Sequence, residues 1–136
     1  MRIGIVFFAK RSREKTRELA RALGRGLEAG GHRVELIDAY QETEKKLSIY
    51  EFLAVGAEPL SAFSGKLADA VPKYLAAAGY LSGKRSLAFM VKQPLFAARA
   101  LARLMKAMEH EGMFLKYSEL LESPAQAEEI GKRLRL

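Results

Sequence analysis

The feature of this sequence that most restricts its fold is a segment with no polar face, followed directly by a segment with helical periodicity. After its first arginine, Arg2–Phe8 contains only apolar side chains and one glycine, which is typical of a parallel strand buried on both faces. Leu19, Leu23 and Leu27 then recur every four residues and form one apolar stripe along a helix. A strand covered on both faces needs a layer above and a layer below it. The pattern therefore predicts an α/β protein.

The same alternation continues along the chain. Further strands are predicted at His32–Asp38, Phe52–Gly56, Ser86–Val91 and Met113–Tyr117, with helical spacing or loops between them. Alternating strands and helices predict a parallel sheet with helices on both faces and right-handed crossovers. The length of 136 residues suits one domain over residues 1–136.

Several residues predict where the helices begin and end. Ser12 or Thr16 could cap the first helix, and Gly30-Gly31 should end it. Pro72 should break the helical region around Leu67–Leu75 and lie in the first turn of its main segment, because proline lacks an amide hydrogen. Ser123-Pro124 predicts the start of the last helix, with Ile130 and Leu134 facing inward.

Eight apolar residues on these strand and helix faces are predicted to be buried. They are Ile5, Phe7, Leu19, Leu23, Val55, Phe89, Leu101 and Met105.

Composition excludes several classes of function. There is no cysteine, and therefore no disulfide, thiolate metal site or cysteine nucleophile. His32 and His110 stand alone, without a glutamate at metal-ligand spacing. No apolar run is long enough to span a membrane, so a cytoplasmic protein is expected. No catalytic constellation is visible. Whether the chain is an enzyme therefore stays open, although a stand-alone enzyme is not favoured.

The net charge of +7 is concentrated near the amino terminus. Residues 1–34 contain nine lysines and arginines against three acids, and Arg13, Arg17, Arg21 and Arg25 recur every four residues. Clustered cations attract anions, although such a stripe is also typical of a solvated helix face. A shorter stripe follows later in the chain, formed by Arg99, Arg103, Lys106 and His110.

Five stretches, taken in order, resemble the flavodoxin family in its short-chain form. They are Arg2–Lys10, Thr16–Ala20, Glu28–Asp38, Tyr50–Gly56 and Leu81–Phe89. Each alone is ordinary α/β sequence, but together they cover essentially the whole chain. The resemblance implies a flavodoxin-like three-layer sandwich with strand order 2-1-3-4-5. It also implies a ligand outside the carboxyl ends of strands one and three.

The resemblance further implies an electron-transfer module that binds flavin mononucleotide (FMN). The family grips the FMN phosphate with a Ser/Thr-x-Thr-Gly-x-Thr loop after strand one, and loops after strands three and four face the ring. The residues that would contact FMN here are Lys10, Arg11, Ser12, Arg13 and Thr16 for the phosphate, with Phe63 and Phe96 for the ring.

The loop after the first strand departs from the family pattern. It has no glycine, and aligning Thr16 with the last threonine of the pattern leaves extra residues. If Ser12 is instead the helix cap, the loop shortens and forms no phosphate cradle. In either register, Lys10, Arg11 and Arg13 could hold an anion at the helix amino terminus.

Two classes of function therefore stay open. The first is an FMN-binding electron-transfer module. The second is a flavin-free binding or regulatory domain whose basic first strand–helix unit contacts an anionic small molecule or an acidic protein. Nucleic acid is not expected as a partner, because no recognition motif is present and no aromatic residue interrupts the basic stripe. Any bound anion is predicted to lie at Lys10–Thr16.

Overall fold

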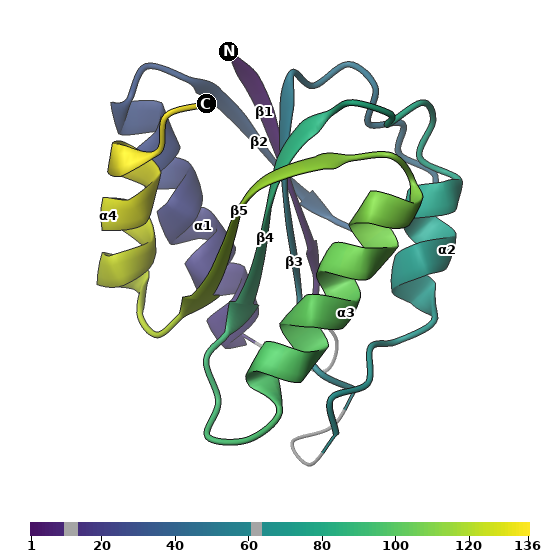
Figure 1. Cartoon of the computed structure of the whole chain (residues 1–136). Helices are drawn as coiled ribbons and strands as arrows, with labels where there is room; N and C mark the ends of the chain where they lie inside the picture. The colour runs from purple at the N-terminus through teal and green to yellow at the C-terminus, as the bar shows by residue number, and fades with distance from the viewer. Residues whose placement is uncertain (10–13, 61–63) are drawn as a thin grey trace.

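The computed structural model of the chain describes residues 1–9, 14–60 and 64–136 (Figure 1). Its elements, in chain order, are β1 (Arg2–Phe8), α1 (Glu14–Ala29), β2 (Arg33–Asp38), β3 (Phe52–Ala57), α2 (Ala70–Ala76), β4 (Arg85–Val91), α3 (Ala97–His110), β5 (Phe114–Leu121) and α4 (Pro124–Arg133).

The five strands form one parallel sheet in the order β2-β1-β3-β4-β5, which confirms the predicted order. β1 lies between β2 and β3, with Ile5 aligned with Leu36 on one side and with Ala54 on the other. The connections that leave β1 and β3 therefore diverge to opposite sides. This topology places a switch point between the carboxyl ends of these two strands.

Helices cover both faces of the sheet, giving the predicted three layers (Figure 1). One face packs against α1 and α4, and the other packs against α2 and α3. Along β1, Ile5 and Phe7 enter the first core, whereas Val6 and Phe8 enter the second. This alternation explains why the strand carries apolar residues on both faces.

Seven of the eight predicted core residues are buried, and Met105 is the exception. Met105 is only partly buried and lies at the margin of the core beneath α3. Its neighbours Leu104 and Met108 are fully buried. The helical pattern thus identified the correct face of α3 but wrongly included Met105 among its fully buried residues.

Three of the predicted helix boundaries are confirmed. The chain leaves α1 through Gly30-Gly31, and Gly31 has a φ of 92°. Pro72 is the third residue of α2, whose short length leaves Leu67 outside the helix. The Ser123 hydroxyl oxygen accepts a hydrogen bond from the Gln126 amide at 3.2 Å, and Pro124 is the first residue of α4.

Other boundaries differ from the prediction. Thr16 does not cap α1, because the helix is already formed at Glu14. His32 lies before β2 because its amide caps α1 by donating to the Leu27 carbonyl at 3.2 Å. β5 extends beyond the predicted Met113–Tyr117 as far as Leu121. It is an edge strand, whose open side tolerates the polar residues that the sequence pattern placed in a loop.

Both ends of the chain lie at the amino end of the sheet, opposite the carboxyl ends of the strands (Figure 1). The last residues are held there through the Tyr117 hydroxyl, which donates to the Arg135 carbonyl at 2.7 Å. Within the described residues, no helix has the length and apolar character needed to cross a membrane.

Candidate functional site

The candidate site lies at the carboxyl edge of the sheet, where β1, β3 and β4 end. Of the seven residues predicted to contact FMN, the structure describes two, Thr16 and Phe96. The other five, Lys10, Arg11, Ser12, Arg13 and Phe63, lie outside the described residues. No contact joins Thr16 to Phe96 in the described part of the chain, and each has a different set of neighbours.

Thr16 is buried at the amino end of α1, with only 2% of its surface exposed. Its hydroxyl donates a hydrogen bond to Glu58 Oε2 at 3.2 Å. Glu58 directly follows β3. A carboxylate therefore links the start of α1 to the end of β3 at the switch point. The sequence pattern did not identify Glu58, because it lies 42 residues from Thr16 in an irregular connection.

The neighbouring end of β2 supplies a second carboxylate. Asp38 Oδ2 lies 3.2 Å from the guanidinium of Arg17, which also binds Glu14 at 3.0 Å. These carboxylates also affect Tyr40. Burial raises the pKa of its hydroxyl, and the negative charges of Glu58 and Asp38 raise that pKa further. The edge near β1, β2 and β3 therefore carries acidic groups as well as cations.

Two of the three described arginines of the stripe on α1 form ion pairs within the molecule. Arg17 binds Glu14 and Asp38, and Arg25 Nε lies 2.8 Å from Glu128 Oε1 on α4. The hydrogen bond from Arg25 lowers the pKa of Glu128. Only Arg21, among the described arginines of the stripe, is exposed and without an ion pair. Arg17 and Arg25 therefore attract external anions less than the spacing of the stripe alone indicates.

Phe96 lies at the start of α3 in a left-handed conformation, with a φ of 65°. It is the one residue other than glycine with positive φ among those the structure describes. Such strain recurs at functional sites. The residue is 38% exposed, and the Arg99 guanidinium lies 5.7 Å from the centroid of its ring. Leu95, beside it, is also exposed.

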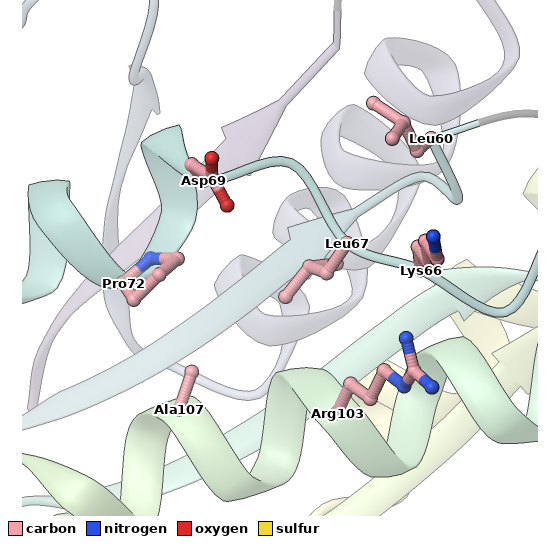
Figure 2. A pocket seen from close by; sticks show the side chains of 7 residues that line it. All are labelled: Leu60, Lys66, Leu67, Asp69, Pro72, Arg103 and Ala107. Atoms are coloured by element: carbon pink, nitrogen blue, oxygen red, sulfur yellow. The ribbon is translucent and has the colours of Figure 1, made fainter.

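Pockets open near this edge, and two of them are lined by cations. One lies where Lys92 binds Glu122 at 2.6 Å, beside Lys15 and Pro94. The other, of about 370 Å3, lies between α3 and the connection from β3 to α2 (Figure 2). It brings Lys66 together with Arg103, a member of the predicted α3 stripe. Lys66 belongs to no periodic pattern, so the sequence did not identify it.

Metal chemistry has no visible ligand set here. Within residues 1–9, 14–60 and 64–136, no group of three or more histidine, aspartate or glutamate side chains could hold a metal ion.

No protein-family model matches this sequence, and no curated protein matches it either. Solved structures nevertheless match over almost the whole chain. Oxidised flavodoxin 1 from Bacillus cereus is 18% identical, with a TM-score of 0.76 over 99% of this chain and 100% of that one. Reduced flavodoxin from Megasphaera elsdenii is 17% identical, with a TM-score of 0.68 over 96% of each chain.

A short-chain flavodoxin associated with a bacterial microcompartment is 11% identical, with a TM-score of 0.70 over 97% of this chain and 95% of that one. These identities are low, so the similarity establishes the fold and leaves ligand binding to the residues of the site. The chain has a flavodoxin-like fold, as its sequence predicted.

Proposed function

We propose that this flavodoxin-like domain works without FMN, as a binding domain for an anionic partner. The observation that carries the proposal is the hydrogen bond from Thr16 to Glu58 at the switch point. In the resemblance to flavodoxins, Thr16 is the last hydroxyl of the phosphate loop. Here that hydroxyl has a carboxylate as its partner.

Two features of the described part of the site support a function without a bound phosphate. A threonine hydroxyl has a single hydrogen to donate, and Thr16 donates it to Glu58 at 3.2 Å. A phosphate at the start of α1 would also lie beside the negative charge of Glu58, and like charges repel. The amino end of α1 attracts anions, but the protein already supplies one there.

The surface charge of the domain favours a partner with a negative charge. The net charge is +7, and several cations on α3 form no ion pair in the described structure. An excess of exposed positive charge raises the local concentration of anions and speeds their association. An acidic partner is therefore favoured over a basic one.

Titration of the purified protein with FMN, and separately with riboflavin, tests the proposal. Flavin fluorescence and calorimetry should show no stoichiometric complex with FMN. A stoichiometric complex that prefers FMN to riboflavin would overturn the proposal, because that preference would show that the phosphate is bound.

One observation favours FMN electron transfer as the second candidate function. Phe96 presents a partly exposed ring in a strained conformation, at the edge where flavodoxins hold the flavin ring. If this candidate is correct, the protein quenches flavin fluorescence and Phe96→Leu weakens the quenching. The same titration therefore decides between the two functions.

A further inference from the structure

We infer that the groove between α3 and the β3–α2 connection docks an acidic segment of a partner protein, and that this segment inserts an apolar side chain. The inference rests on the proposed function as a binding domain. It adds where the partner binds and what chemistry the partner has.

The floor of the groove is apolar. Leu67 from the connection and Ala107 from α3 pack against the core beneath, and Pro72 closes one side (Figure 2). Leu60 stands at the rim with 60% of its surface exposed. An exposed aliphatic residue beside an apolar floor favours a partner that buries an apolar side chain there.

The groove is also cationic. Lys66 and Arg103 stand on either side of one part of it (Figure 2), and Arg99 and Lys106 continue the positive face along α3. None of these four cations forms an ion pair with any acid among the described residues. Asp69, the one acid lining the groove, lies at its other end, near the start of α2 (Figure 2). Carboxylates of a partner would supply the missing counter-charge.

The backbone that presents these cations is held in place. The Lys66 carbonyl accepts a hydrogen bond from the Leu60 amide at 2.9 Å, and the Lys66 amide donates to Ser64 Oγ at 3.0 Å. The connection also contacts α3 closely, because a Cβ atom on Gly65 would lie 2.6 Å from Cδ of Arg99. An ordered groove loses less entropy on binding than a loose one.

The lining favours a protein segment over nucleic acid. Among the described residues, the lining of the groove includes aliphatic side chains and cations but no aromatic ring on which a base could stack. A small inorganic anion would satisfy the charges but would leave the apolar floor exposed to water. An acidic segment with one apolar residue satisfies both features.

The test uses a synthetic peptide with one leucine flanked by glutamates, added to the full chain labelled with nitrogen-15. Backbone amide shifts should map to residues 64–72 and 99–107. Lys66→Glu/Arg103→Glu should weaken binding about tenfold or more. The control, Arg21→Glu/Arg33→Glu, changes the net charge equally at exposed positions elsewhere and should leave the affinity nearly unchanged. If the first variant does not fold, Lys66→Gln/Arg103→Gln replaces it.

Several results would overturn the inference. Equal weakening by both double variants would indicate diffuse attraction between opposite charges. If a peptide with glutamines in place of the glutamates binds equally well, the cations of the groove do not contribute to binding. If a peptide with alanine in place of the leucine binds equally well, the apolar floor does not contribute. Shifts confined to Lys10–Thr16, tighter binding of a single-stranded oligonucleotide to the same face, or no binding would also contradict it. The FMN titration is independent of these outcomes, so failure of the peptide test and failure of the flavin-free proposal are distinguishable.

Discussion

Tyr50 illustrates how strongly one side chain can depend on its surroundings. Its ring is buried beneath the sheet, and its hydroxyl donates a hydrogen bond to Glu35 on β2, which also binds Lys45 at 3.0 Å. Burial, followed by the hydrogen bond to Glu35, raises the pKa of Tyr50 to about 12. In the other direction, that bond lowers the pKa of Glu35.

This arrangement predicts that stability falls in strongly alkaline solution. In the unfolded chain the pKa of Tyr50 has its ordinary value of 10.0, whereas in the folded protein it is about 12. The contribution is therefore fully present below pH 10 and is lost as pH rises towards 12, by at most about 1.4 kcal/mol per pH unit. Urea denaturation between pH 8 and pH 11.5, in roughly half-unit steps, measures this slope.

Tyr50→Phe should make the slope shallower. Tyr74 should retain its own share, because burial raises its pKa to about 12 as well. An unchanged slope in Tyr50→Phe would show that other groups control alkaline unfolding.

The sequence predicted the contacts of some residues but not of others. Local signals identified the Ser123 cap and the turn at Gly31, since both depend on neighbours within a few positions. The contact of Thr16 with Glu58 spans 42 residues, and that of Arg25 with Glu128 spans 103. Spacing along α1 could predict that its arginines share a face but could not reveal the acids that neutralise them.

At the scale of elements, α1 and α4 pack so closely that only glycine fits at two positions of their contact. A Cβ atom on Gly26 would lie 2.1 Å from the Glu128 carbonyl oxygen, and one on Gly131 would lie 2.6 Å from the Leu23 carbonyl oxygen. The two helices lie side by side on one face of the sheet (Figure 1). Their approach is therefore limited by backbone rather than by side chains.

Two glycines of the same helix should respond oppositely to alanine. Gly26→Ala should lower the free energy of unfolding by about 1–3 kcal/mol or more, because the helices must separate. Gly24→Ala places its Cβ at ordinary distances, 3.4 Å from Val34 and 3.5 Å from Ile5. It should be neutral or stabilise by up to about 1 kcal/mol through helix propensity. Urea denaturation of both variants checks this, and a stable Gly26→Ala would contradict the close approach.

The same packing explains why the prediction for the inward face of α4 was incomplete. Ile130 and Leu134, which the pattern indicated, do pack against the core on this face, but both are only partly buried. The buried residues of α4 are Ala127 and Gly131, which the pattern did not identify. Hydrophobic spacing favours large side chains, whereas this contact selects small ones.

For the whole molecule, the sheet separates two hydrophobic cores, which should unfold in a single transition. Leu23 belongs to the core beneath α1 and α4, and Leu104 belongs to the core beneath α2 and α3. Leu23→Ala and Leu104→Ala should each cost about 2–5 kcal/mol, because both side chains are fully buried.

Fluorescence and circular dichroism should follow one coincident unfolding transition in each variant, since the strands of one sheet contribute to both cores. Separate transitions, or a variant of near-normal stability, would show that one face folds independently of the other.

The architecture was more predictable than the candidate site. Strands that are apolar on both faces, such as β1 and β4, must form the middle layer of the fold. The helices that connect the parallel strands form the outer layers. The groove has no comparable signal, because Lys66 lies in an irregular connection and meets Arg103 only after folding.

The position of the chain ends has a practical consequence. Both ends emerge at the amino end of the sheet, whereas the carboxyl edge, with Glu58 and Phe96, lies opposite (Figure 1). A molecule tethered to a sensor surface through either end would therefore present this edge outward, and an affinity tag would lie far from it. Attachment through Lys66 would instead cover the groove, so comparing the two orientations gives a mutation-free check of which side of the domain meets its partner.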